Sequence, residues 1–231
     1  AWFALGAAGA MAGCAARGPV ELDPAAVELS VVAETDRQWT GVAVSRDERI
    51  FLNFPRWSDD VAVSVVELTD DGSLVPYPDA QWNNWTMGTE PGARFVCVQS
   101  VYVDGKNRLW ILDPANPKFE GVVEGGPKLV EVDLASDEVV RAIGIPPAVA
   151  PADSYLNDVC IDTEREVAYI TDSGNGALVV VDLEYGTSRR LLDEHPSTHW
   201  EAVALTIEGE EWRRPDGSLP QVHADGLALS P

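Results

Sequence analysis

Residues 99–113 read QSVYVDGKNRLWILD, and similar phrases occur at three other places in the chain. They stand at residues 40–54 (TGVAVSRDERIFLNF), 157–172 (NDVCIDTEREVAYITD) and 225–231 (DGLALSP). Each phrase starts with a polar residue, continues as an alternating apolar segment, and reaches an Asp or Ser. In the first three, a polar turn and a second apolar segment follow. Period-two alternation on both sides of a turn predicts a β-hairpin.

The spacing of the phrases indicates the architecture. Ser45, Asp104, Asp162 and Ser230 occupy equivalent positions and are 59, 58 and 68 residues apart. Hairpin repeats of this length are typical of β-propeller blades with four strands, slightly longer than familiar blades of ~40–50 residues. The sequence therefore predicts an all-β propeller with three blades and part of a fourth. Functional residues are expected where each innermost strand begins, beside the central channel.

The charge balance narrows the range of partners. The chain has 16 Lys and Arg against 38 Asp and Glu, a formal net charge of −22. Nucleic acid and anionic membrane surfaces would be repelled, whereas a cationic ligand would be favoured mildly. The alternative interpretation is that acidic turns keep the surface hydrated.

The first residues have the composition of a targeting segment. Residues 1–13, AWFALGAAGAMAG, are uncharged and apolar, a length that suits the hydrophobic core of a signal peptide. Residues 11–14, Met-Ala-Gly-Cys, resemble a bacterial lipobox, which predicts lipidation of Cys14. We expect residues 14–36 to be a tether and residues 37–231 a partial propeller. The location is then extracytoplasmic, either secreted or attached to the membrane only through a lipid.

Two features lead us to expect a piece of a longer protein. The chain has no initiator Met, and its last phrase ends at Pro231, before a second strand. The remaining cysteines, Cys97 and Cys160, lack the spacing of a zinc site and lie at different levels of adjacent blades. Free buried thiols are favoured over a disulfide between them.

Five segments are informative as a set: LVPYPD at 74–79, VQSVYVD at 98–104, SYLND at 154–158, AYITDS at 168–173 and DGLALSP at 225–231. Together they resemble the yellow/major royal jelly protein family. The resemblance implies a six-bladed propeller, usually secreted, of which about three and a half blades are present. Insect members of this family are linked to pigmentation, to nutrition and, in blood feeders, to binding biogenic amines in the channel. One departure is LDPA at 112–115, where the family usually has Leu-Asp-Thr-Gly.

The repeat itself selects the candidate site residues. Thr40, Gln99, Asn157 and Asp225 each stand five residues before the equivalent Asp or Ser of their phrase. Polar side chains at the start of apolar inner strands face either the channel or a backbone partner. Converging polar groups in a concave site are the usual starting hypothesis for ligand binding. We call these four residues the ring residues.

A metal site is a further interpretation of the ring. The chain distantly resembles regucalcin/gluconolactonase propellers, whose metal ligands include an Asn and an Asp that match Asn157 and Asp225. Thr40 stands where those enzymes carry an acidic ligand, so a divalent cation such as calcium, which prefers ~6–8 oxygens, would be held weakly. The ring residues therefore admit backbone hydrogen bonding, ligand binding without a metal, or a metal site.

Other catalytic motifs are missing from the sequence. His195 and His199 have i, i+4 spacing, but Pro196 lies between them, so we interpret them and His223 as surface or capping residues. No GxSxG nucleophile motif and no glycine-rich phosphate loop occur. Three functions remain: a propeller that binds a cationic or aromatic small molecule in its channel, a metal-dependent lactonase-like hydrolase, or a non-catalytic surface interaction protein.

Overall fold

The computed structural model describes residues 30–230, and their regular structure is almost entirely β. The chain divides into a segment up to Glu34 and a unit that begins at Thr35, which contains every described strand. The predicted signal segment 1–13, Cys14 and most of the tether lie outside the described residues. Within residues 30–230, no helix has the length and apolar character that crossing a membrane requires.

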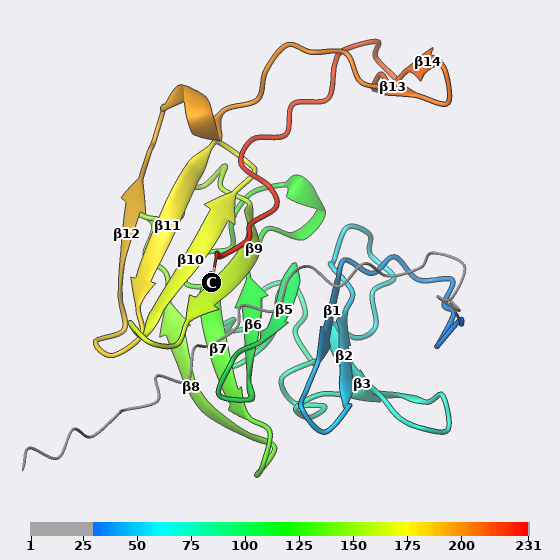
Figure 1. Cartoon of the computed structure of the whole chain (residues 1–231), viewed down its shortest axis with the longest axis vertical. Helices are drawn as coiled ribbons and strands as arrows, with labels where there is room; N and C mark the ends of the chain where they lie inside the picture. Colours follow the sequence, from blue (N-terminus) through cyan, green and yellow to red (C-terminus); the bar gives the residue numbers. More distant parts are fainter. Residues whose placement is uncertain (1–29, 231) are drawn as a thin grey trace, which may run out of the picture. The chain divides into compact units, whose positions relative to one another are not determined.

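Three four-stranded antiparallel sheets follow one another along the chain, each a simple meander (Figure 1). Blade 1 consists of β1 (Gly41–Val44), β2 (Ile50–Asn53), β3 (Val65–Leu68) and β4 (Leu74–Pro76). Blade 2 consists of β5 (Ser100–Val103), β6 (Arg108–Asp113), β7 (Lys128–Asp133) and β8 (Glu138–Gly144). Blade 3 consists of β9 (Leu156–Asp162), β10 (Val167–Asp172), β11 (Ala177–Asp182) and β12 (Thr187–Leu191). The predicted all-β blade architecture is confirmed.

The remaining described elements are short. They are the 3-10 turns η2 (Pro117–Phe119) and η3 (Pro196–Thr198) and the small hairpin of β13 (Thr206–Ile207) and β14 (Glu210–Glu211). The fourth phrase forms no strand in residues 225–230. It nevertheless contacts blade 3, because the Leu227 amide donates to the Asp158 carboxylate at 3.0 Å and Cys160 Sγ lies 3.5 Å from the Leu227 carbonyl oxygen.

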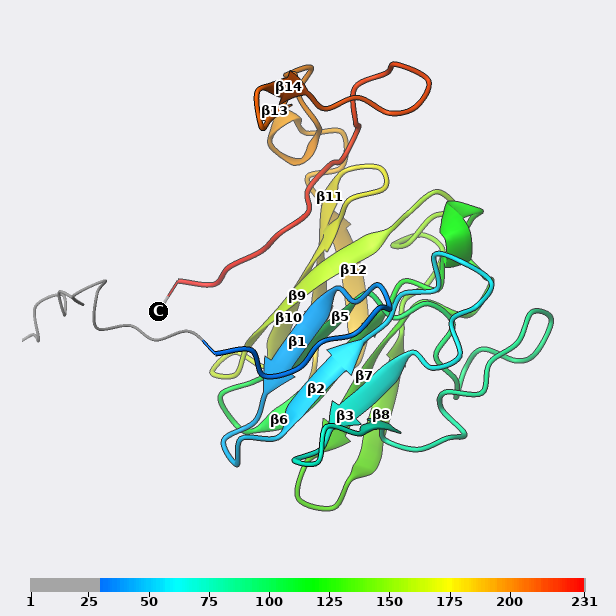
Figure 2. The same ribbon diagram turned by 90° about the vertical axis from the view of Figure 1, so that its right-hand side faces the viewer.

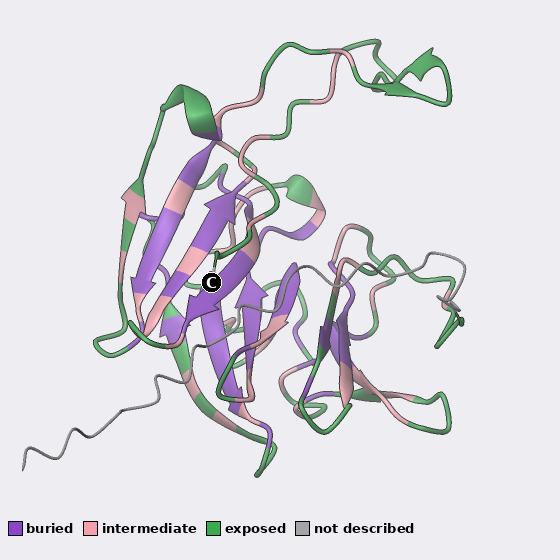
Figure 3. Ribbon diagram, in the orientation of Figure 1, coloured by how far each residue is buried: buried purple, intermediate pink, exposed green. Residues whose placement is uncertain are grey.

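The first strands of neighbouring blades lie against one another. Strand β5 contacts both β1 and β9, and Figure 2 shows β5 and β9 beyond β1, seen from the side of blade 1. Apolar alternation places the core between successive sheets. Figure 3 shows the buried residues concentrated in the inner strands, while exposed residues recur along the outer strands β8 and β12.

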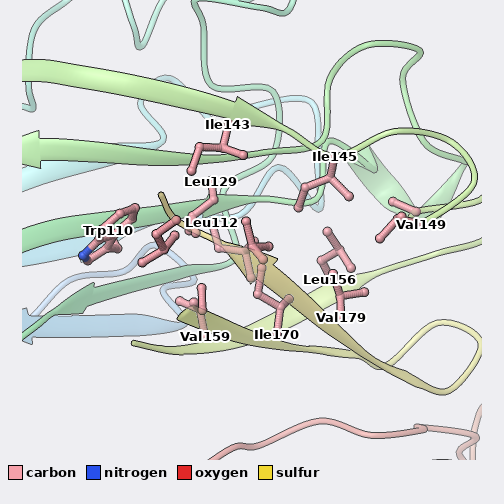
Figure 4. Close-up of a cluster of buried hydrophobic side chains, with 14 of the residues drawn as sticks. Trp110, Leu112, Leu129, Ile143, Ile145, Val149, Leu156, Val159, Ile170 and Val179 are labelled. Carbon is pink, nitrogen blue, oxygen red and sulfur yellow. The ribbon is translucent and has the colours of Figure 1, made fainter. Parts of the chain in front are cut away.

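Side chains from both neighbouring sheets fill the space between blades 2 and 3 (Figure 4). Trp110 and Leu129 of blade 2 and Leu156 and Ile170 of blade 3 are fully buried there. A second cluster of buried apolar side chains, which includes Phe51, lies between blades 1 and 2. Blade 2 takes part in both clusters, because alternate side chains of β6 point to opposite faces of its sheet: Trp110 and Leu112 lie in the first cluster, and Leu109 and Ile111 lie in the second.

The Asp or Ser that anchors each phrase has a structural role in its hairpin. Asp104 Oδ1 accepts the backbone N–H groups of Lys106 and Arg108 at 2.8 and 3.0 Å. Asp162 caps the equivalent turn of blade 3, and Ser45 Oγ accepts the Arg49 amide at 3.1 Å in blade 1. These residues recur because the turn needs an acceptor at this position.

A buried carboxylate ends the second strand of blades 2 and 3. Asp113 accepts the amides of Val96, Cys97 and Ala115 at 2.7–3.0 Å, and Lys128 Nζ donates to it at 2.9 Å. Both charged side chains are almost inaccessible, at 0% and 3% exposure. Asp172 repeats this arrangement in blade 3, where Arg190 supplies the positive charge at 2.6 Å.

We predict that removal of the Asp113 carboxylate destabilises the fold severely. Asp113→Ala leaves three amides and a buried ammonium group without their acceptor, so the free energy of unfolding should fall by about 3–5 kcal/mol. Asp113→Asn combined with Lys128→Met should cost much less, because no uncompensated charge remains. Denaturant unfolding measures both variants, with the exposed Asp70→Asn as a control expected to stay within ~0.5 kcal/mol. An Asp113→Ala loss no larger than that control would contradict the prediction.

Candidate functional site

Three of the four ring residues meet in one hydrogen-bonded chain that crosses all three blades. Thr40, before β1, donates through Oγ1 to the carbonyl oxygen of Gln99 at 2.7 Å. Gln99, before β5, donates through Nε2 to Asn157 Oδ1, near the start of β9, at 3.0 Å. Three of the four repeat-equivalent residues are therefore joined directly by hydrogen bonds.

Asn53 at the end of β2 fixes the first member of this chain. Its Nδ2 donates to Thr40 Oγ1 at 2.7 Å and to the Val98 carbonyl oxygen at 3.0 Å. Because Thr40 accepts this hydrogen bond, its hydroxyl proton is directed toward Gln99. The polar groups of blade 1 are thus oriented before any ligand is present.

Gln99 is buried, and both ends of its side-chain amide are occupied. Besides Asn157, it contacts Tyr155, whose hydroxyl donates to Gln99 Oε1 at 2.8 Å. Burial raises the pKa of Tyr155, so its hydroxyl keeps the proton that this hydrogen bond requires. The amide of Gln99 is therefore held in one orientation.

The fourth ring residue, Asp225, is placed by its backbone. Thr171 Oγ1 donates to the Asp225 carbonyl oxygen, while the Asp225 carboxylate makes no hydrogen bond within residues 30–230. Its side chain is open to solvent on one side, yet partial desolvation and the nearby Asp158 carboxylate raise its pKa. Asp158 in turn joins three segments, since it accepts Ser100 Oγ at 3.2 Å and the Leu227 amide at 3.0 Å.

An aromatic cluster that the repeat did not predict adjoins Gln99. It consists of Trp57, Phe119 and Tyr155. Trp57 Nε1 donates to the Tyr155 hydroxyl at 2.6 Å, and the Phe119 ring centroid lies 4.7 Å from that of Tyr155 and 5.8 Å from that of Trp57. Phe119 is 60% exposed. The sequence offered little signal, because Phe119 lies in a Pro- and Gly-rich connection that has no repeat equivalent.

The backbone that carries Phe119 is strained. Lys118 and Phe119 have φ values of 56° and 59°, in the left-handed region that bulky side chains rarely occupy. Each such residue costs on the order of 1–3 kcal/mol, and strain of this kind clusters at functional sites. The turn η2 thus presents the exposed Phe119 ring from a backbone conformation that is itself unfavourable.

The described cysteines do not supply a nucleophile. Cys97 and Cys160 are both free and buried. Burial, reinforced by the charge of Asp113, raises the pKa of Cys97 to about 12, so the reactive thiolate is not populated at neutral pH.

The histidines have separate roles. His195 caps η3, because its Nδ1 accepts the Ser197 amide at 3.2 Å, which confirms the capping interpretation. His199 is not on a helix with His195. It packs instead edge-to-face against His223, with ring centroids 4.8 Å apart, a contact that the sequence did not predict.

No three His, Cys, Asp or Glu side chains converge on a common point in the described part of the chain. The acids at the ring are Asp158 and Asp225. A hollow of about 470 Å³ lies in blade 1, lined by residues that include Arg37, Phe54 and Ser58, and contains none of the four ring residues. The ring is thus a strip of oriented polar groups bordered by aromatic faces.

Sequence comparisons with known proteins point to one protein family. The sequence profile of the family described as "Major royal jelly protein" matches residues 96–231. Major royal jelly protein 7 of Apis mellifera is 26% identical over 210 residues, which cover 78% of this chain and 44% of that protein. Protein yellow of Drosophila melanogaster is 25% identical over 154 residues, covering 62% and 28%. The chain thus spans less than half the length of these relatives.

Solved structures with a similar arrangement of strands are more distant in sequence. An auxiliary nutrient binding protein from Bacteroides ovatus is 12% identical, with a TM-score of 0.46, over 78% of this chain and 38% of that one. The structure of streptogramin B lyase is also 12% identical, with a TM-score of 0.43, over 84% and 57%.

We predict that Asp158 holds the fourth phrase against blade 3. Asp158→Asn loses one of the two carboxylate oxygens, so the charge-assisted hydrogen bond from Leu227, worth about 1.5–3 kcal/mol, should be weakened or lost. Hydrogen exchange of the Leu227 amide should then accelerate by up to about 10- to 100-fold. Asp162→Asn is the matched control, because that carboxylate bonds only within its own turn. Unchanged Leu227 exchange in Asp158→Asn would show that the segment is held by other contacts.

Proposed function

Because the chain belongs to the major royal jelly protein family, we propose that it forms part of a β-propeller that binds a small cationic or aromatic molecule where the inner strands begin. The observation that carries this proposal is the hydrogen-bonded chain Thr40–Gln99–Asn157, with the aromatic cluster attached to Gln99 through Tyr155. The six-bladed closure that the family implies would place this strip at the mouth of a channel.

The groups left free at the ring suit such a ligand. Asn157 Nδ2 and the Asp225 carboxylate make no hydrogen bond to described residues, so both can contact a bound molecule. The exposed Phe119 ring and the partly buried Trp57 supply apolar and π surfaces on the side of the ring where Tyr155 binds Gln99. An aromatic face and a carboxylate together recognise a cation that carries a ring.

The raised pKa of Asp225 supports a cation in particular. Its negative charge is disfavoured by desolvation and by Asp158, and a positive ligand would offset both effects. Because its pKa is raised in the folded chain, the ionised Asp225 carboxylate lowers the stability of the fold at pH values above that pKa. This destabilisation disappears at lower pH, where the carboxylate is protonated. Affinity for a cation should decrease over the same fall in pH.

We predict the following for tryptamine, a cationic aromatic probe, measured by isothermal titration calorimetry. Asp225→Asn should raise the dissociation constant about 10- to 100-fold, because a charge-assisted contact is worth about 1.5–3 kcal/mol. Phe119→Ala should raise it about fivefold, the equivalent of about 1 kcal/mol of aromatic contact. Tyr185→Ala, an exposed aromatic residue in a turn of blade 3, and His195→Ala are controls that should bind normally. If Asp225→Asn binds as tightly as the wild type while a control loses binding, the proposed site is wrong.

The adjacent carboxylates of Asp158 and Asp225 favour one alternative, a divalent-metal-dependent lactonase-like hydrolase. Calcium would gain the two acids, but Asn157 Oδ1 is already occupied by Gln99. Tryptamine binding that persists after exhaustive chelation supports the binding protein. Lactone hydrolysis that chelation abolishes and calcium restores supports the hydrolase. If neither activity is found, the proposal falls, and a non-catalytic surface interaction protein is the remaining candidate.

We further propose that the protein acts outside the cytoplasm, secreted or held by a lipid on Cys14. The support is the apolar segment that leads into the Met-Ala-Gly-Cys sequence at residues 11–14. After expression from the natural start in a bacterial host, mass spectrometry of the mature protein should show that residues 1–13 are removed and that Cys14 is lipidated. An unmodified Cys14 in the mature protein would contradict the lipid anchor.

A further inference from the structure

The contact between His199 and His223 lies outside the ring and has no part in the proposed function. The two residues come from different segments, His199 directly after η3 and His223 shortly before the fourth phrase. Their rings meet edge-to-face, with centroids 4.8 Å apart and planes at 88°. Each imidazole carries one nitrogen that is shielded from solvent and has no hydrogen-bond partner: Nε2 of His199 and Nδ1 of His223.

Backbone hydrogen bonds hold both histidines in place. The Ala224 amide donates to the Thr198 carbonyl oxygen at 2.8 Å, which joins the residues next to the two histidines. The His223 amide donates to the Ser173 carbonyl oxygen at 3.2 Å. Thr198 is itself buried, and its hydroxyl contacts the Leu192 and His195 carbonyl oxygens. Backbone hydrogen bonds therefore fix the positions of the two histidines relative to each other.

Gly176 supplies the space that the pair needs. Its φ is +77°, and a Cβ atom at this position would lie 2.8 Å from His199 Cδ2 and 2.9 Å from His223 Nδ1. Any side chain here would push against both rings. Position 176 is thus restricted to glycine both by its backbone conformation and by the two imidazoles.

Two buried ring nitrogens without partners require an explanation, because burying such groups costs free energy unless something binds them. A neutral imidazole carries a lone pair on one of its ring nitrogens, so each of these two nitrogens can act as a metal ligand. Asp172 also faces the pair, but its carboxylate is already bound by Arg190 and Ser154 at 2.6 Å. A cation at the histidines would therefore meet nitrogen ligands and no free carboxylate.

We propose that His199 Nε2 and His223 Nδ1 form a two-histidine site for a late first-row transition-metal ion, with Zn²⁺ as the representative. Neutral imidazole suits Zn²⁺, Cu⁺ and Ni²⁺, whereas Ca²⁺ and Mg²⁺ require oxygen ligands. Water molecules would complete the coordination. A bound ion would connect η3 to the segment that leads into the fourth phrase.

The test is Zn²⁺ titration of the metal-stripped protein by calorimetry, together with X-ray absorption of the loaded protein. We expect one Zn²⁺ per chain and a spectrum that contains two imidazole ligands. His199→Gln and His223→Gln should each raise the dissociation constant by at least about tenfold, since even loss of a residue that only supports a ligand costs 10- to 100-fold. His195→Gln, an exposed histidine four residues away, is the matched control and should bind as the wild type does.

Three results would overturn the proposal: no Zn²⁺ binding by the wild type, equal affinity in the His199→Gln and His223→Gln double variant, or loss of binding in His195→Gln alone. If a variant unfolds, the absorption spectrum of the wild-type protein still decides, because a spectrum with fewer than two imidazoles excludes the site. Tryptamine binding should be unaffected by either histidine variant, so failure of this site is distinguishable from failure of the ring.

Discussion

The buried carboxylate at the end of the second strand is the interaction on which the blades depend. In blades 2 and 3, Asp113 and Asp172 bind the amides of the segment that enters their blade and pair with a cation from a later strand of the same sheet. One carboxylate thus joins the entering connection, the second strand and a later strand of the same sheet. Charged groups this deeply buried are tolerated only when all their hydrogen bonds are made, which makes the arrangement specific for one geometry.

Blade 1 departs from this rule, and the departure bears on the site. Asn53 stands where the other blades have Asp, and within residues 30–230 no Lys or Arg pairs with it. Its neutral amide turns toward blade 2 and binds Thr40 and the Val98 carbonyl oxygen. In blades 2 and 3 the residue at the end of the second strand makes its contacts within its own blade. In blade 1 the equivalent residue, Asn53, orients Thr40 and joins blade 1 to blade 2.

Other charged groups connect the blades near the hairpin turns. Arg49 of blade 1 pairs with Asp137 of blade 2 at 2.8 Å, and Arg108 of blade 2 pairs with Glu166 of blade 3 at 3.3 Å. Most of the acidic excess instead lies in solvated turns. The negative charge therefore favours cationic partners in general and does not by itself mark a site.

How far the sequence could predict these features depends on whether they repeat. The blades, the turn acceptor Asp104 and the convergence of Thr40, Gln99 and Asn157 follow from positions that recur at a nearly constant spacing. Phe119 could not be predicted, because it lies in a connection without an equivalent and its role depends on backbone angles. The His199–His223 contact was also missed, since it joins two irregular segments whose approach is set by tertiary backbone hydrogen bonds.

Gln99 illustrates a consequence for how such a protein can change over evolution. All four of its polar groups are engaged: the amide with Leu112, the carbonyl with Thr40, and the two ends of the side chain with Asn157 and Tyr155. A substitution there would disturb three blades at once, so selection for a new ligand has little freedom at this position. A substitution of Phe119 would break no such network of hydrogen bonds, because its side chain is apolar, extends from a connecting turn and is exposed. Diversity among related propellers should therefore accumulate in the connections, while the inner strands keep their polar residues.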